Sequence, residues 1–255
     1  MALATHGTTT GALYVYGFVR GGALKRFRQE GVDGADVTVV EGEGIAAIVS
    51  PVRTTDMKMK RRDLHRHLGV IESAFESTTV IPCAFGTIVE SSAELEDGVL
   101  IGARDDLLDG FARLDGKVQM NVKATYDEEK LLREILASDP QVAALRERTR
   151  GAGEAGYYDR IRLGEIVAAR VEERTEADTA RLADALTAHA VDVTLEAPGR
   201  GVALRGSFLV ARKSLARFES ALEALARAER PLLRFEAIGP LPPTAFAASS
   251  VNSRG

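Results

Sequence analysis

Apolar residues fill both faces of a segment near the start of the chain, over residues 13–19. Its side chains are Leu13, Tyr14, Val15, Tyr16, Gly17, Phe18 and Val19. Because neighbouring strand residues point to opposite faces, this pattern predicts a strand in the middle of a sheet. Two further apolar stretches, over residues 37–41 and 45–50, surround Gly42-Glu43-Gly44 and predict a hairpin.

The next segment combines a helical pattern with an extended one. One face of the expected helix carries Leu64, Leu68, Ile71 and Phe75, which recur every three or four residues. Residues 80–89 are apolar again, but Pro82 and Gly86 interrupt them. A proline inside a strand belongs at an edge or a bulge, because it cannot donate a ladder hydrogen bond. We therefore expect a helix with this face buried, followed by one kinked strand at an edge or a bulge of its sheet.

A turn signal near the middle of the chain marks a boundary. Ser91 and Glu94 form a capping-box pattern, which predicts a helix that is bent at Gly98 or Gly102. Asp115-Gly116 follows this helix and is typical of a turn. We place the domain boundary at this pair.

The second half predicts the order strand, helices, strand, strand, helix, strand, which is the order of a ferredoxin-like domain with inserted helices. The expected elements cover residues 117–123, 131–136, 142–150, 157–189, 191–195, 202–210, 215–225 and 233–237. In the first strand, Val118, Met120 and Val122 point inward, and Gln119 and Asn121 point outward. A helix over residues 157–189 would be about 50 Å long at 1.5 Å per residue.

These elements predict an α+β fold in two domains. Residues 1–12 form a disordered lead, and residues 13–115 form an N-terminal α+β domain. Residues 116–243 form a ferredoxin-like C-terminal domain that includes one long helix, and residues 244–255 form a flexible tail.

Composition narrows the function mainly by exclusion. The chain has 255 residues and a formal net charge of −4, so it lacks the basic excess that is typical of nucleic-acid binders. Cys83 is the single cysteine, which is typical of a reducing compartment. We find no apolar stretch of about 18 residues that would span a membrane, and no secretory pattern at the start. We therefore expect a cytoplasmic protein without nucleic-acid or membrane partners.

Gly151-x-Gly153-x-x-Gly156 spells a dinucleotide-binding fingerprint. That fingerprint binds pyrophosphate only on a turn from a strand into a helix. A charged, helical segment precedes it here, so we interpret the three glycines as a link between two helices. We expect no cofactor.

Cys83 lies close in sequence to His65 and His67, which raises the hypothesis of a thiol hydrolase. That hypothesis requires a histidine within hydrogen-bond reach of the thiol. Apolar neighbours favour a buried, inert cysteine instead, and a hydrogen bond to the nearby turn explains His67. Because His65 and His67 are two residues apart on a helix, they cannot bind one metal ion together. We expect no catalytic residues, no metal site and no enzymatic activity.

A basic run leads into the helix that is expected to end near Phe75. It contains Lys58, Lys60, Arg61, Arg62 and Arg66. Such a run either meets an acidic partner or is a solvated helix start. The long helix is a second candidate for a partner surface, because its apolar stripe is interrupted by Asp178.

Five short motifs resemble the gas vesicle protein F/L family. They are Tyr14-x-Tyr16-Gly17, His67-x-x-Val70-Ile71-Glu72, Val80-Ile81-Pro82-x-x-Phe85-Gly86-Thr87, Gly156-Tyr157-Tyr158 and Gly239-Pro240-Leu241-Pro242-Pro243-x-x-Phe246. Their order spans nearly the whole chain. The chain departs from the family in the last motif, where Leu241 and Thr244 stand in place of an aromatic pair.

The resemblance implies a cytoplasmic accessory protein or minor component of gas vesicles, without enzymatic activity. Its implied partners are the hydrophobic shell protein and other gas vesicle accessory proteins. We expect it to limit aggregation of the shell protein during nucleation and assembly, through the first domain. The candidate contact residues are Lys58, Arg61, Arg62, Arg66, Pro82 and Phe85. The alternative is a regulatory protein that binds a small molecule with its ferredoxin-like domain.

Overall fold

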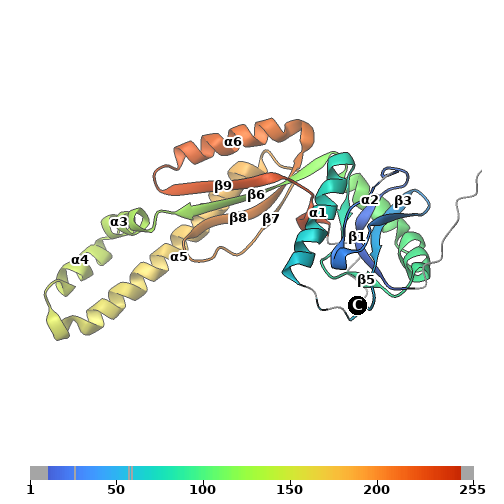
Figure 1. Cartoon of the computed structure of the whole chain (residues 1–255). Helices are drawn as coiled ribbons and strands as arrows, with labels where there is room; N and C mark the ends of the chain where they lie inside the picture. Colours follow the sequence, from blue (N-terminus) through green and yellow to red (C-terminus); the bar gives the residue numbers. More distant parts are fainter. Residues whose placement is uncertain (1–10, 26, 57, 59, 248–255) are drawn as a thin grey trace, which may run out of the picture. The chain divides into compact units, whose positions relative to one another are not determined.

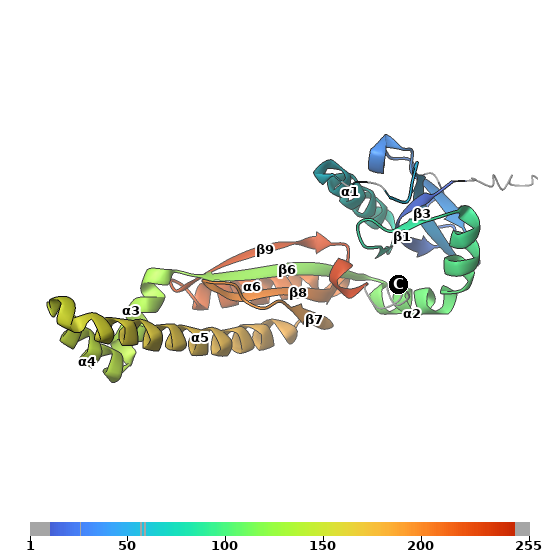
Figure 2. The same ribbon diagram turned by 90° about the horizontal axis from the view of Figure 1, so that it is seen from below.

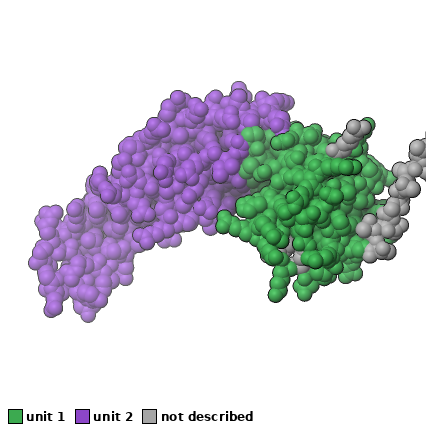
Figure 3. All heavy atoms as spheres, in the orientation of Figure 1, with its two compact units in different colours: residues 1–119, 240–255 green, residues 120–239 purple. Residues whose placement is uncertain are grey.

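The computed structural model describes residues 11–247 except residues 26, 57 and 59. Contacts divide the chain into two compact units, which Figure 3 colours separately. Unit 1 holds Met1–Gln119 and Pro240–Gly255, and unit 2 holds Met120–Gly239. Most of the predicted lead, and the predicted tail beyond residue 247, lie outside the described residues.

Unit 1 is built on an antiparallel sheet with the strand order β2-β3-β1-β4 (Figure 1). Its main strands are β1 (Leu13–Arg20), β2 (Thr38–Glu41) and β3 (Ile45–Pro51). The predicted central place of β1 is confirmed, since β3 pairs with one edge and β4 and β5 pair with the other. The hairpin between β2 and β3 is also confirmed, and the N–H of Gly42 donates to the carbonyl of Ile45 at 2.8 Å.

The prediction of one kinked strand over residues 80–89 is wrong. Two short strands, β4 (Ile81–Pro82) and β5 (Ile88–Val89), pair separately with β1. A bulge in β1 at Tyr16 shifts the register there, and the N–H of Cys83 donates to the Tyr16 carbonyl at 2.9 Å. The chain then leaves the sheet and turns at Gly86, whose φ of 94° favours glycine.

The helices of unit 1 are α1 (Arg61–Ser77), the π-helical segment η2 (Glu94–Ile101) and α2 (Arg104–Leu114). The predicted bend is confirmed at Gly102, which separates η2 from α2. Ser91 Oγ accepts the N–H of Glu94 at 3.1 Å, as expected for the start of this helix.

The predicted buried face of α1 is partly wrong. Leu64 and Leu68 are 37% and 39% exposed, whereas the buried residues of the helix are Asp63, His67, Val70, Ile71, Ala74 and Phe75. The carboxylate of Asp63 accepts the N–H of Lys60, and His67 contacts a core tyrosine. Because these two polar groups have partners, they can be buried. The helix therefore packs with Asp63 and His67 toward the core, and Leu64 and Leu68 stay partly exposed.

Unit 2 has the strand order β7-β8-β6-β9. Its elements in chain order are β6 (Lys117–Tyr126), α3 (Glu128–Ser138), α4 (Pro140–Thr149), η3 (Gly153–Gly156), α5 (Tyr157–Thr187), β7 (Asp192–Leu195), β8 (Val202–Ala211), α6 (Leu215–Ala228) and β9 (Leu233–Leu241). This order and topology confirm the ferredoxin-like fold, with α3 and α4 inserted after the first strand.

The core of unit 2 lies between the sheet and two helices, α5 and α6, which contact each other and β8 (Figure 2). The rings of Phe208 and Phe218 lie 5.5 Å apart there, and Leu182 and Leu186 of α5 are buried. The first half of α5 contacts α3 and α4 instead. With 31 residues, α5 is about 46 Å long, close to the length that its sequence predicted.

The first residues of the predicted tail are ordered within unit 1. Thr244–Phe246 form a short 3-10 helix, and Phe246 is buried. Arg113 donates to the carbonyl of Phe246 at 3.1 Å, and Gln119 Oε1 accepts the N–H of Ala245 at 2.9 Å. The second bond explains why Gln119 is buried, although alternation predicted that it points outward.

Candidate functional site

An apolar hollow of about 280 Å³ opens on unit 1. It lies between α1, the turn after β4 and the returning C-terminal residues. Its lining residues are Leu64, His67, Leu68, Pro82, Cys83, Ala84, Phe85, Thr87, Thr244 and Ala247. Leu64, Leu68 and Phe85 each keep more than a third of their surface exposed. The hollow therefore presents apolar side chains to solvent, as binding surfaces do.

A buried polar cluster supports the wall of the hollow. The Tyr14 hydroxyl accepts the N–H of Gly86 at 2.9 Å and lies 3.0 Å from Nδ1 of His67. The imidazole stacks on the Tyr16 ring, with centroids 5.8 Å apart, and meets the edge of Phe85 at 5.6 Å. These contacts fix the turn that carries Phe85.

His67 is neutral in this environment. Burial lowers the pKa of His67 to about 4, although a hydrogen bond with the backbone of Cys83 acts in the opposite direction. Burial also raises the pKa of Tyr14, so its hydroxyl keeps its proton. A neutral imidazole can accept a hydrogen bond from that hydroxyl at Nδ1. The hydrogen bond between His67 and the backbone of Cys83 agrees with the predicted structural hydrogen bond to the nearby turn.

Cys83 lines the hollow but is not activated. Burial raises the pKa of the Cys83 thiol to about 12, so the thiolate that a nucleophile requires is disfavoured. The imidazole of His67 already bonds Tyr14 and the Cys83 backbone. This arrangement favours a structural cysteine over the thiol-hydrolase hypothesis.

Six side chains were predicted for partner binding, and the structure places them in three groups. Pro82 and Phe85 line the hollow. Lys58, Arg61 and Arg62 are exposed at the start of α1. Arg66 instead pairs with Glu30 and is only 30% exposed.

The sequence did not identify several lining residues of the hollow. The sequence pattern places Leu64 and Leu68 on the buried face of the helix, and Thr244 and Ala247 in the tail, whereas all four line the hollow. A sequence signal existed for the helix: Asp63 and His67 are four residues apart and share one face. Burying that polar face exposes the leucines. No local signal marks the two C-terminal residues.

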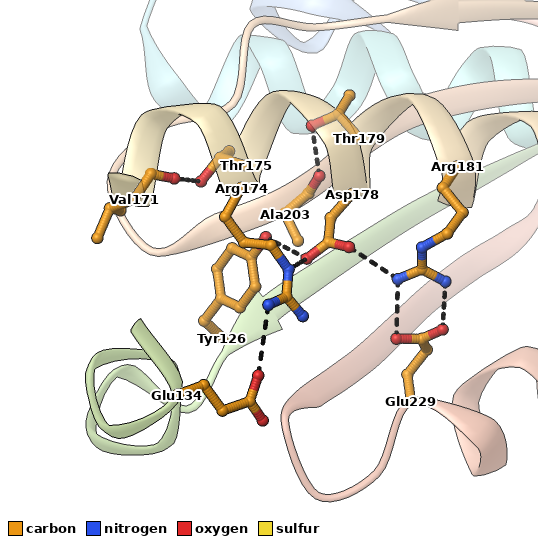
Figure 4. A network of polar contacts seen from close by, with 10 residues as sticks. All are labelled: Tyr126, Glu134, Val171, Arg174, Thr175, Asp178, Thr179, Arg181, Ala203 and Glu229. Carbon is orange, nitrogen blue, oxygen red and sulfur yellow. Dashed lines mark hydrogen bonds and ion pairs between the residues drawn. The ribbon is translucent and has the colours of Figure 1, made fainter. Parts of the chain in front are cut away.

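Unit 2 contains a network of polar contacts around Asp178 of α5 (Figure 4). Asp178 is buried, and its carboxylate accepts bonds from the Tyr126 hydroxyl at 2.9 Å, Arg174 Nε at 2.8 Å and Arg181 Nη2 at 2.8 Å. The two guanidinium groups also pair with Glu134 and Glu229. Asp178, which interrupts the apolar stripe in the sequence, is therefore the centre of an ion network.

The cavities and glycines of unit 2 offer no convergent ligand groups. A cavity of about 510 Å³ beside α3 and α5 is lined by Arg170, Asp139 and Glu173, but these groups pair with one another. Gly153 and Gly156 lie in η3, which connects α4 to α5 as predicted. Over the described residues, no cluster of three metal-binding side chains occurs. Within the same residues, no helix is both long and apolar enough to cross a membrane.

Comparisons with known proteins agree with the fold and extend over both units. The family model described as gas vesicle synthesis protein GvpL/GvpF matches residues 12–248. Gas vesicle protein F of Streptomyces sp. (strain CB03234) is 36% identical over 238 residues, covering 91% of this chain and 98% of that protein. Gas vesicle protein F1 of Halobacterium salinarum is 35% identical, covering 44% of this chain and 53% of that protein.

Solved structures show the same fold. The crystal structure of GvpF from Anabaena sp. PCC7120 superimposes with a TM-score of 0.83 at 21% identity, covering 94% of this chain and 100% of that chain. GvpF from Microcystis aeruginosa gives a TM-score of 0.75 at 22% identity, with the same shares covered. The chain belongs to the gas vesicle synthesis protein GvpL/GvpF family, whose members are gas vesicle accessory proteins.

Proposed function

We propose that this accessory protein binds the hydrophobic shell protein of gas vesicles and limits its aggregation during nucleation and assembly. The observation that carries the proposal is the hollow of unit 1, where Leu64, Leu68 and Phe85 are exposed together. Subunits of an apolar shell aggregate through exposed apolar surface and free strand edges unless these are covered. A preformed apolar hollow is suited to that task.

The hollow by itself supplies a modest share of the binding energy. Burying a large apolar side chain completely contributes about 1.5–3 kcal/mol. Leu64, Leu68 and Phe85 are 37%, 39% and 37% exposed, so covering them adds roughly 2–3 kcal/mol together. Association costs at least about 4 kcal/mol in lost freedom of motion. Further contacts around the hollow are therefore required.

Co-expression with the shell protein tests the proposal. The soluble fraction of the shell protein should rise with the wild-type chain, and the two proteins should co-purify. Leu68→Ser should reduce both effects. Leu132→Ser is the matched control, because Leu132 is also an exposed helical leucine, 39% exposed, but lies on α3 of unit 2.

Two results would contradict the proposal. The first is a shell protein that stays insoluble and does not co-purify in the presence of the other accessory proteins. The second is a truncated chain that retains binding with only the residues after Gly116. The ligand-sensor alternative would then gain weight, and a thermal shift with a metabolite would support it.

The proposal places the protein in the cytoplasm and at the gas vesicle, with other gas vesicle accessory proteins as further partners. The cavity of about 510 Å³ in unit 2 does not favour a small-molecule sensor, because Arg170, Asp139 and Glu173, which line it, pair with one another. The apolar hollow of unit 1 favours a protein partner.

A further inference from the structure

The exposed charges of α1 run against the dipole of the helix. A helix is stabilised by acidic groups near its N-terminus and by basic groups near its C-terminus. The buried Asp63 follows this rule, because it lies in the first turn and accepts the N–H of Lys60 at 2.9 Å. The exposed charges have the opposite order, with Lys60 and Arg61 at the N-terminal end and Glu72 and Glu76 in the second half. Capping of the helix does not require these exposed charges, so they can serve another role.

Two of these charges share the face of α1 that borders the hollow. At about 100° per residue, Arg61 lies about 20° from Leu68 around the helix axis, and Glu72 lies about 40° from Leu68. Arg62, by contrast, lies about 120° away from Leu68. The side of α1 next to the hollow therefore carries, in chain order, the cation Arg61, the two leucines Leu64 and Leu68, and the anion Glu72.

Neither charge at the ends of this strip is neutralised by a neighbour. Arg61 and Glu72 are exposed, and neither takes part in any ion pair found among the described residues. Arg62 and Arg66, on the other sides of the helix, approach Asp63 and Glu30. Both charges beside the hollow are therefore available for a partner.

We propose that the hollow and these two charges bind one amphipathic segment of the shell protein, with an acidic residue opposite Arg61 and a basic residue opposite Glu72. This inference rests on the proposed function and adds the chemistry and direction of the segment. The two charges are eleven positions apart, which is about 16 Å along the helix. The segment therefore carries its two charges at that separation, with apolar side chains between them. The charges set the orientation, and the apolar contacts fill the hollow.

Overlapping peptides that cover the shell protein sequence provide the test, by fluorescence anisotropy with the full chain. Arg61→Glu should weaken binding of the best peptide by about fivefold or more at low salt, and the difference should shrink at high salt because exposed charges are screened. Arg217→Glu is the matched control, since it makes the same charge change at an exposed arginine in the first turn of α6, in unit 2. Changing the acidic residue of the peptide to lysine should restore binding to the Arg61→Glu chain.

The possible failures separate the two ideas. If Leu68→Ser weakens binding but Arg61→Glu and Arg217→Glu act alike at every salt concentration, the charge-guided orientation is refuted and the apolar hollow still binds. If peptides bind the wild-type chain and the Leu68→Ser chain equally, the hollow is not the site, and both ideas fail. If no peptide or shell protein binds the wild-type chain, the proposed function itself fails.

Discussion

Replacing Asp178 by asparagine tests whether the ion network of Figure 4 holds unit 2 together. Burial raises the pKa of Asp178, but hydrogen bonds from Arg181, Tyr126 and Arg174 outweigh that effect and keep the pKa below its usual range. Asparagine has nearly the same shape but no charge and a single acceptor oxygen. It would place an amide N–H against one of the guanidinium groups.

The expected loss follows from the number of bonds and from the exposure of the partners. Hydrogen bonds to charged groups contribute about 1.5–3 kcal/mol each, and the carboxylate of Asp178 accepts three. Arg174 and Arg181 are 36% and 49% exposed, so water and their remaining acidic partners recover part of the loss. We expect Asp178→Asn to lower the free energy of unfolding by about 2–3 kcal/mol.

Urea denaturation of the full chain, followed by circular dichroism, measures this change at pH 7. A loss of that size corresponds to a fall in Tm of roughly 10 °C for a unit of this length. Asp184→Asn is the control, because Asp184 lies on the same helix but is exposed. That control should change the free energy of unfolding by less than about 0.5 kcal/mol.

The pH dependence gives an independent check. Because the pKa of Asp178 is lower in the folded chain than in the unfolded chain, its contribution is fully present above about pH 4 and is lost as the pH falls further. The difference between wild type and Asp178→Asn should therefore be constant from neutral pH down to about pH 5, and should shrink below pH 4. An Asp178→Asn chain as stable as Asp184→Asn at pH 7 would refute the reasoning.

Three further predictions concern unit 1 and its hollow. NMR titration should place the pKa of His67 near 4; since this is below the unfolded value, stability should fall by about 3 kcal/mol as the pH drops from about 6.5 to 4, and a pKa near 6.5 would contradict the buried site. Cys83 should react slowly with a thiol reagent at pH 8 in the folded chain and rapidly in urea, because burial raises its pKa; equal rates would argue against it. Gly17→Ala should destabilise unit 1 and loosen the hollow, because a Cβ there would lie 2.6 Å from the carbonyl oxygen of Ile81. Gly164→Ala is the control; it lies in open space on α5 and should stabilise the helix by about 0.5–1 kcal/mol. Similar effects of the two substitutions on stability would refute the close approach of β4 to Gly17.

Local patterns in the sequence determined most of the elements and the topology of unit 2. Apolar residues on both faces of residues 13–19 were enough to place β1 inside its sheet, because side-chain alternation depends only on the strand itself. The order of strands and helices after Gly116 was enough for the ferredoxin-like fold, because short connections leave few alternative topologies. The length of α5 followed from the helical pattern over residues 157–189, which contain no proline.

Only the tertiary structure decided which side of α1 is buried. The apolar stripe predicted that Leu64 and Leu68 are covered, but the buried polar residues are Asp63 and His67. A polar group can be buried only where it finds a partner. The partner of His67 is Tyr14, which is 53 positions away in the chain. No pattern within the helix contains that information.

The hollow also depends on contacts between residues that are far apart in the chain. One wall comes from β4 and the turn at Gly86, whose path depends on a bulge in β1. Another comes from Thr244 and Ala247, which follow unit 2 in the sequence yet belong to unit 1. The sequence by itself therefore determined the secondary structure and named Pro82, Phe85 and Arg61 as candidates. The exposure of the leucines beside them was decided by contacts between residues far apart in the chain, because burial is a property of the folded surroundings and not of the segment.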